Sequence, residues 1–189
     1  MNVKIVLIGN SGVGKTTTVR KATNNTLTEV PTPTLGAAYA SLKRKCGEKE
    51  IQLQIWDTAG QEKYRSIAPM YFRGVQIAVL MYSVTDPYSF QAIEDWHNDL
   101  LQHVEGTIVK FLVANKIDCE DKRVVSIEEG REKAYELDAI FYEVSAKSGR
   151  GVVDLFDEIT SQASENVIKV QHSTVPVNES NPAKKKECC

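Results

Sequence analysis

The sequence predicts an α/β fold: a six-stranded, mainly parallel β-sheet with one antiparallel strand and helices on both faces. Short apolar runs alternate along the chain with segments whose apolar residues recur at helical spacing. Strands separated by helices need crossover connections, which favour parallel pairing and helices on both faces of the sheet. The chain of 189 residues is long enough for one domain with a sizeable core.

The strands are predicted from apolar runs and their polar boundaries. Residues 3–8 form an apolar run that ends at a glycine, as expected for a buried strand. Residues 38–45 and 50–56 flank a glycine-containing turn, and apolar and polar residues alternate in the second segment. This pattern predicts a hairpin with one buried face. Residues 77–84 and 108–114 are apolar runs that suit strands buried on both faces.

Helices are predicted between the strands. Asp86 and Pro87 suit a helix cap and first turn, and apolar residues continue at helical spacing to Leu101. Ser126 and Glu129 match a capping box that begins another helix. The apolar face of a last amphipathic helix is predicted to consist of Val153, Phe156, Ile159, Ala163 and Val167.

Composition argues against several classes of protein. Hydrophobic residues make up 42% and charged residues 25%, as in soluble globular proteins. The formal net charge of -2 gives no sign of a nucleic-acid partner. The N-terminus lacks the layout of a secretory signal, and no apolar stretch approaches the length of a bilayer span, so we expect a cytosolic body. Cys46 and Cys119 are expected to be free thiols.

A glycine-rich loop follows the first predicted strand and opens a helix. Residues 9–16 read GNSGVGKT, which in this context indicates a P-loop and the P-loop NTPase fold. Glycines let backbone N–H groups turn toward phosphate oxygens, and the helix N-terminus adds partial positive charge. Lys15 is expected to reach the β- and γ-phosphates, and Thr16 to bind Mg²⁺ through its hydroxyl. The nucleotide-binding residues expected in this segment are Ser11, Gly12, Val13, Gly14, Lys15, Thr16 and Thr17.

A second phosphate-binding segment closes the third predicted strand. Residues 57–61 read DTAGQ, in which Asp57 can hold Mg²⁺ through water and the Gly60 N–H can touch the γ-phosphate. Gln61 can orient the attacking water, which makes it the predicted catalytic residue. Thr34 is expected to join the Mg²⁺ shell only when a γ-phosphate is present. The predicted metal-site residues are Thr16, Thr34 and Asp57.

The tetrapeptide Asn115-Lys116-Ile117-Asp118 follows the fifth predicted strand and indicates the base. A carboxylate accepts two hydrogen bonds from the N1–H and 2-amino groups of guanine, whereas adenine would leave Asp118 buried and unpaired. A site of this kind can discriminate between bases by roughly 10⁴ or more. Asn115 is expected to read the opposite side of the base, and the stem of Lys116 to lie along its plane.

The triplet Ser145-Ala146-Lys147 follows the sixth predicted strand and completes the expected nucleotide site. It would support the base-binding loop, with the Ala146 N–H near the base oxygen.

These elements, in this order over residues 3 to about 168, resemble the Ras superfamily of small GTPases. Residues 56–62, residues 71–74 and the terminal Cys188-Cys189 resemble the Rab branch most closely. Residues 35–39 and 68–71 further resemble the early-endocytic Rab group.

The resemblance implies a monomeric, GTP-hydrolysing switch in vesicle traffic that binds GTP or GDP with Mg²⁺. No residue is identifiable as a built-in arginine finger, so we expect slow hydrolysis that an activating protein accelerates by about 10³ to 10⁵. The other implied partners are an exchange factor, effectors and a prenyl-binding escort. Tyr39, Trp56 and Tyr71 match the aromatic trio of the Rab effector surface, with core packing as the competing interpretation.

Two alternatives remain open. A P-loop kinase or ATPase would have no use for the guanine-reading tetrapeptide. A catalytically weak module that binds GTP and recruits effectors is disfavoured by Gln61, but Ser11 stands where a side chain can crowd the γ-phosphate. Leu27 also replaces an aromatic ring that family members usually place against guanine, which predicts faster nucleotide exchange.

Residues 169–189 are predicted to form a flexible tail after a GTPase domain of residues 1–168, since polar residues dominate from Gln171 onward. Cys188 and Cys189 follow a run of lysines, a pattern that resembles double geranylgeranylation in Rabs. Two lipids matter because a single chain anchors only marginally. The expected location is the cytoplasmic face of membranes, early endosomes by the endocytic resemblance, and the cytosol when escorted.

Overall fold

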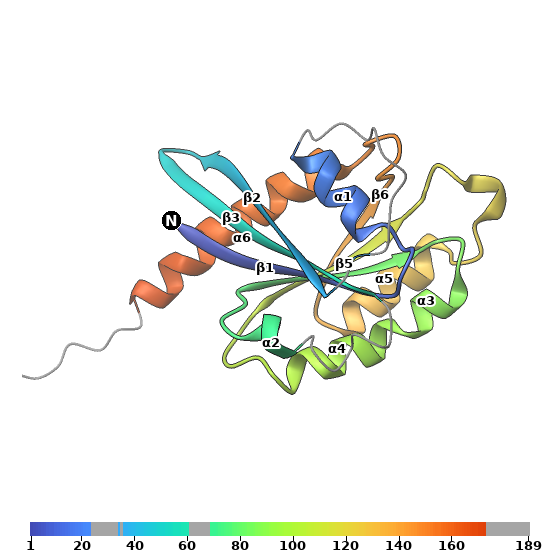
Figure 1. Cartoon of the computed structure of the whole chain (residues 1–189), viewed down its shortest axis with the longest axis horizontal. Helices are drawn as coiled ribbons and strands as arrows, with labels where there is room; N and C mark the ends of the chain where they lie inside the picture. The colour runs from blue at the N-terminus through green and yellow to red at the C-terminus, as the bar shows by residue number, and fades with distance from the viewer. Residues whose placement is uncertain (24–33, 35, 61–68, 173–189) are drawn as a thin grey trace, which may run out of the picture.

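A computed structural model describes residues 1–23, 34, 36–60 and 69–172, without the side chains of Pro69 and residues 166–172. The strands, shown in Figure 1, are β1 (Asn2–Ile8), β2 (Ala37–Cys46), β3 (Lys49–Thr58), β4 (Ile77–Ser83), β5 (Val109–Asn115) and β6 (Ile140–Val144). The helices are α1 (Lys15–Ala22), α2 (Pro69–Phe72), α3 (Pro87–Gln91), α4 (Ile93–Leu101), α5 (Ile127–Glu136), α6 (Val152–His172) and the short 3-10 helix η2 (Glu120–Lys122).

The sheet confirms the predicted fold class. Its strand order is β2-β3-β1-β4-β5-β6, and every neighbouring pair is parallel except the antiparallel β2–β3 hairpin. Strand β4 is buried along its whole length, as predicted for a central strand. In β3, Ile51, Leu53 and Ile55 are buried and alternate with partly exposed residues, which confirms the one-sided hairpin.

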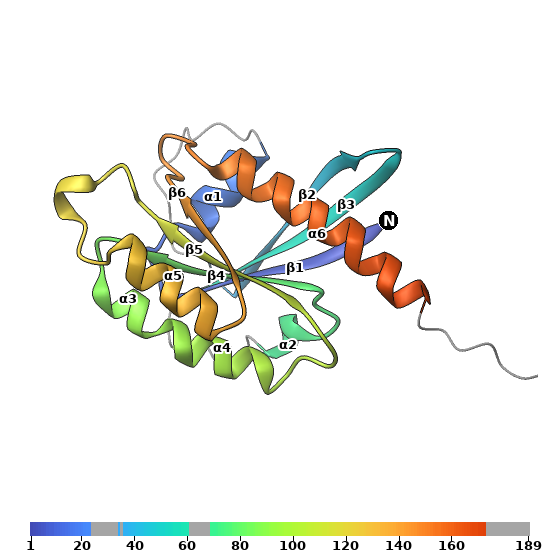
Figure 2. The ribbon, with the colours of Figure 1, turned by 180° about the vertical axis from the view of Figure 1, so that it is seen from behind.

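Helices cover both faces of the sheet, as Figures 1 and 2 show from opposite sides. Alternating β1 residues divide the core into two clusters: Ile5 packs with α1 and α6, whereas Val6 packs with α2, α4 and α5. Burial of each large aliphatic side chain contributes roughly 1.5–3 kcal/mol. In folds of this kind, ligands bind at the carboxyl ends of the parallel strands.

Two predicted helix starts are confirmed by their caps. The Tyr88 N–H donates to Asp86 Oδ1 at 3.1 Å, and the Glu129 N–H donates to Ser126 Oγ at 3.2 Å, completing a capping box. The prediction of one continuous helix to Leu101 is wrong, because a turn at Ala92 separates α3 from α4. With ψ of -11°, Ala92 tightens the backbone locally, and its N–H is shared between the carbonyls of Tyr88 and Phe90.

Helix α6 differs from its prediction at both ends. Val153 is 56% exposed and Val152 is buried, because the buried face continues through Leu155, Phe156 and Ile159 at helical spacing. Val167 lies where side chains are not described. The helix reaches His172, inside the range predicted as tail, and the remaining residues with Cys188 and Cys189 lie outside the described part. Within the described ranges, no helix has both the length and the apolar character to span a bilayer.

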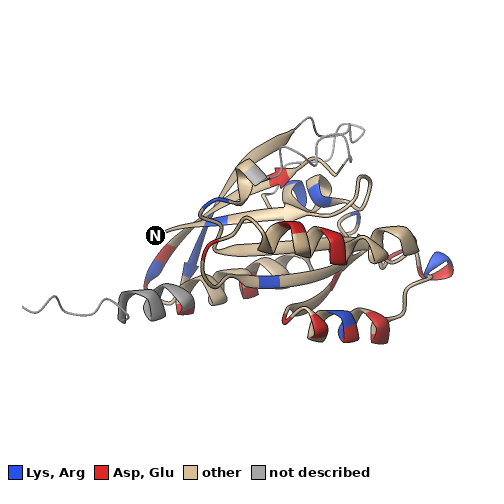
Figure 3. Ribbon diagram, turned by 90° about the horizontal axis from the view of Figure 1, so that it is seen from below, with Lys and Arg blue, Asp and Glu red and all other residues tan. Residues whose placement is uncertain are grey.

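Helices α4 and α5 lie on the same face of the sheet, as Figures 1 and 2 show. Helix α5 carries charges of both signs, whereas the charged residues of α4 are acidic (Figure 3). Lys133 of α5 pairs with Glu94 of α4 at 3.9 Å and with Glu136 in its own helix at 2.5 Å. Exposed pairs of this kind contribute about 0–1 kcal/mol each, so packing beneath them holds the two helices in place.

Candidate functional site

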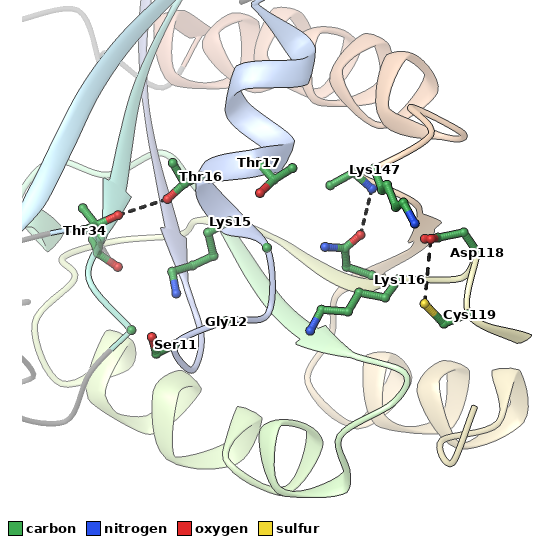
Figure 4. Close-up of a pocket in the computed structure, with 15 residues that line it drawn as sticks. Ser11, Gly12, Lys15, Thr16, Thr17, Thr34, Lys116, Asp118, Cys119 and Lys147 are labelled. Carbon is green, nitrogen blue, oxygen red and sulfur yellow. Dashed lines mark hydrogen bonds between the residues drawn. The ribbon is translucent and has the colours of Figure 1, made fainter. Parts of the chain in front are cut away.

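A cavity of about 370 Å³ opens at the carboxyl ends of the parallel strands (Figure 4). Its lining contains every residue predicted to bind nucleotide except Val13 and Ser145, which are buried behind it. Thr58 and Cys119 also line the cavity, although no sequence motif singled them out. Thr58 directly follows Asp57 and Cys119 directly follows Asp118 in the sequence. This adjacency to predicted site residues was the one sequence signal that could have indicated them. The lining is Ser11, Gly12, Gly14, Lys15, Thr16, Thr17, Thr34, Thr58, Gly60, Asn115, Lys116, Asp118, Cys119, Ala146 and Lys147.

Lys15 brings a buried positive charge to one end of the cavity. Its side chain is 5% exposed, and Nζ donates to the carbonyl oxygens of Gly9 at 2.6 Å and Asn10 at 3.0 Å. Burial lowers the pKa of Lys15 to about 8, although the nearby Asp57 carboxylate opposes the shift. An anion such as phosphate at this position would compensate the ammonium for its lost hydration.

The start of helix α1 adds a second attraction for anions. Gly14 precedes the helix with φ of +103°, and a side chain there would collide with the amide of Asn115. No side chain caps this helix start, and its first turn holds no acidic residue. Its unpaired N–H groups and the helix dipole therefore favour a bound phosphate at this end of the cavity.

Three oxygen-bearing side chains meet beside Lys15. Thr16 Oγ1 donates to Asp57 Oδ2 at 2.5 Å and lies 3.0 Å from Thr34 Oγ1 (Figure 4 shows the Thr16–Thr34 pair). Asp57 is 2% exposed, and its Oδ1 has no hydrogen-bond partner among the described residues. Burial raises the pKa of Asp57, an effect that the Thr16 hydrogen bond and Lys15 oppose. A buried, unsatisfied carboxylate oxygen beside two hydroxyls fits Mg²⁺, which prefers oxygen ligands.

Asp118 lies at the opposite end of the cavity. Ser145 Oγ donates to Asp118 Oδ1 at 2.6 Å, and Ser145 in turn accepts the Ser148 N–H at 3.0 Å. The Ser145 hydrogen bond lowers the pKa of Asp118, so this carboxyl group is an ionised, acceptor-only group at neutral pH. The Asp118 side chain is exposed in this structure, and its pairing with a base stays a prediction.

Asn115 joins three segments at the wall of the cavity. It is 1% exposed, and its Nδ2 donates to the Val13 carbonyl at 2.7 Å while its Oδ1 accepts the Ala146 N–H at 2.9 Å. A buried amide must satisfy its polar groups, and these two loops supply the partners. The Ala146 N–H, expected near the base oxygen, is thus held by Asn115 here. The expected contacts of Asn115 and Ala146 with a base stay predictions.

The three aromatic residues of the expected partner surface form one contiguous group. Ring centroids are 5.4 Å apart for Tyr39–Trp56 and again 5.4 Å apart for Trp56–Tyr71. Trp56 packs partly against the core, whereas Tyr39 is 53% exposed and the neighbouring Met70 is 74% exposed. Core packing therefore accounts for Trp56 in part and does not account for Tyr39.

Gln61, the predicted catalytic residue, lies outside the described residues, as do Leu27 and the terminal Cys188 and Cys189. Their roles stay predictions from the sequence.

Comparison with known proteins adds independent information. A family model described as the Ras family matches residues 4–165. The chain is 37% identical to the Ras-related protein RabC of Dictyostelium discoideum, covering 98% of this chain and 96% of that protein. It is 38% identical to the GTP-binding protein ypt2 of Schizosaccharomyces pombe, covering 99% and 96%. It is also 38% identical to the Ras-related protein Rab5 of Nicotiana tabacum, covering 86% and 81%.

Proposed function

This chain belongs to the Ras family as a Rab-type small GTPase, and from that premise we infer that its cavity binds GTP, hydrolyses it to GDP and thereby switches partner binding. The observation that carries the proposal is the arrangement of one cavity, with Lys15 and the α1 N-terminus at one end and Asp118 at the other. A cation-lined end suits a polyphosphate, and an acceptor-only carboxylate suits the N–H groups of guanine.

Each residue has a distinct role in the proposed reaction. Lys15 binds the β- and γ-phosphates and stabilises the negative charge that develops on the leaving β-phosphate oxygen as its bond to the γ-phosphorus breaks. Thr16, Thr34 and Asp57 would hold Mg²⁺, which when bound neutralises charge on the phosphate oxygens. Gln61 orients the water for in-line attack, and Asp118 holds the base.

Switching follows from contacts that only GTP can make. Thr34 and the Gly60 N–H would contact the γ-phosphate and lose this partner after hydrolysis. Thr34 directly precedes the segment that leads to Tyr39, and Gly60 follows the strand that carries Trp56. Loss of the γ-phosphate would therefore change the conformation of the surface formed by Tyr39, Trp56 and Tyr71. We propose that this surface binds effectors.

Single-turnover release of phosphate from bound GTP tests the hydrolysis step. We expect slow hydrolysis by the isolated protein and a further loss of roughly 10²-fold or more in Gln61→Leu, because one positioned catalytic group contributes on this scale. GTP affinity should change little, since Gln61 acts on water. If the wild-type protein binds GTP but releases no phosphate, the alternative of a catalytically weak, effector-recruiting module is correct.

Alkylation of Cys119 reports whether the base lies at the Asp118 end. Cys119 lines the cavity and its Sγ is 3.8 Å from Asp118 Oδ2, whereas Cys46 is a free thiol in β2, outside the cavity. Bound GDP should slow labelling of Cys119 by a maleimide about tenfold or more and leave Cys46 unchanged, which peptide mass spectrometry measures. Equal labelling of Cys119 with and without GDP would place the base elsewhere.

For the remainder of the chain we propose a membrane-attached role in vesicle traffic, of an endocytic kind. The support is the Rab-named relatives, one of them named Rab5, and the resemblance of residues 35–39 and 68–71 to the early-endocytic group. The segment that follows α6, from residue 173 to 189, would act as a tether beyond the GTPase domain. Exchange and activating proteins and a prenyl-binding escort would act on the monomer, which lies on the cytoplasmic face of early endosomes or in the cytosol.

Lipidation of Cys188 and Cys189 is the testable part of this role. The double variant Cys188→Ser/Cys189→Ser should move from the membrane fraction to the cytosol, because a bilayer anchor requires two chains or one chain with added charge. Each single variant should retain partial membrane binding. Unmodified terminal cysteines in mass spectra of the native protein would contradict the proposal.

A further inference from the structure

A buried hydrogen bond joins helix α4 to the phosphate-binding loop. Trp96 of α4 is 3% exposed, and its indole Nε1–H donates to Asn10 Oδ1 at 2.8 Å. The two residues are 86 positions apart, so only the folded chain brings them together. A buried tryptophan needs an acceptor for its one N–H group, and Asn10 provides it. The bond restrains Asn10 at the second position of the loop.

Asn10 also contacts two groups of the proposed phosphate site. Its carbonyl oxygen accepts a 3.0 Å hydrogen bond from Lys15 Nζ. Gly60 lies against the same peptide group, so closely that a Cβ on Gly60 would collide with the carbonyl carbon and oxygen of Asn10. A shift of Asn10 would therefore disturb both the lysine and the glycine that the phosphates require.

We propose that Trp96 is a positioning residue for the nucleotide: through Asn10 it holds the phosphate-binding loop in the conformation that retains the β-phosphate and slows nucleotide release. Trp96 is absent from the cavity lining, so it acts through Asn10. The inference rests on the guanine-nucleotide site proposed above. The competing role is packing alone, because the Trp96 ring belongs to the buried cluster between α4 and the sheet. In that role a phenylalanine would serve nearly as well.

Release of bound GDP from the full-length protein, in Mg²⁺ and excess competing GDP, distinguishes the two roles. Trp96→Phe keeps an aromatic ring but removes the N–H donor, and Asn10→Ala removes the acceptor. Each variant should release GDP about tenfold faster than wild type, equivalent to about 1.4 kcal/mol. The double variant should be no faster than the faster single variant, because both changes remove the same bond. Selectivity for GDP over ADP should persist, since Asp118 is untouched.

Leu100→Ala is the matched control for packing. Leu100 is fully buried in the same helix and the same cluster, so its truncation leaves a cavity and should lower Tm at least as much as Trp96→Phe. Its GDP release should stay within about twofold of wild type if packing does not set the rate.

Three results would overturn the positioning role: release from Trp96→Phe at the wild-type rate, equal acceleration in Leu100→Ala, or single effects that multiply in the double variant. None of these three results would contradict the proposed function, provided that the wild-type protein retains GDP. Failure of the wild-type protein to retain GDP would instead contradict the proposed function itself.

Discussion

Asp118→Asn should lose GTP affinity by roughly 10²-fold or more and should instead favour xanthosine triphosphate, since a site built on such hydrogen bonds discriminates strongly. The Asp118 carboxylate is acceptor-only and is oriented by Ser145, so it matches the N1–H and 2-amino groups of guanine. An asparagine amide places an N–H where guanine also presents a donor. Xanthine has a carbonyl at that position and accepts this N–H. Competition binding with GTP, xanthosine triphosphate and ATP measures this change in nucleotide preference.

A nearby carboxylate supplies the control for the base-reading role. Asp121 lies in η2, is exposed and is absent from the cavity lining, so Asp121→Asn makes the same chemical change outside the site. Its nucleotide preference should equal that of wild type. Unchanged GTP affinity in Asp118→Asn, or an equal loss in Asp121→Asn, would remove the assignment of Asp118 to the base.

Lys15→Met should lose GTP and GDP affinity by roughly 10²-fold, because one hydrogen-bonded charged contact contributes about 1.5–3 kcal/mol. The variant keeps the aliphatic stem but leaves the carbonyl oxygens of Gly9 and Asn10 without their donor and the phosphates without the ammonium group. The preference for guanine over adenine should survive in the residual binding. Calorimetric or fluorescence titration with GDP and ADP measures both quantities.

Lys21→Met is the matched control for this change. Lys21 lies in the last turn of the same helix, α1, and is absent from the cavity lining. Lys21 is partly buried and its stem lies beside Gly149, which is also outside the lining, so the nucleotide affinity of this variant should remain within about twofold of wild type. If Lys15→Met bound GDP as tightly as Lys21→Met, the phosphate end of the cavity would be wrongly assigned.

Much of the fold was predictable because local patterns determine it. The apolar runs of β4 and β5 and the alternation in β3 follow directly from which faces are buried. The break at Ala92 was not predictable, because the apolar spacing continues across it and alanine is a strong helix former. The α6 face was misplaced because Val152 and Val153 are chemically identical, and only packing against the sheet decides which is buried.

The candidate site likewise has features that the sequence predicts and features that it does not. Short segments such as the loop from Gly9 to Thr16 carry their chemistry in consecutive residues, so the sequence alone indicates phosphate binding. The contacts that orient these residues are long-range. The hydrogen bonds of Asn115 with Val13 and of Trp96 with Asn10 join loops that only the folded sheet brings together. Local sequence patterns therefore could not predict these two hydrogen bonds.

Competition of GTP against ATP for the purified protein, in the presence of Mg²⁺, tests most directly whether the cavity is a guanine-nucleotide site. The combination of Lys15, the α1 N-terminus and Asp118 predicts tight binding of GTP and GDP, with ATP weaker by roughly 10⁴ or more. Denatured protein should likewise release guanosine phosphates retained from the cell. Equal affinity for GTP and ATP would contradict this assignment of the cavity.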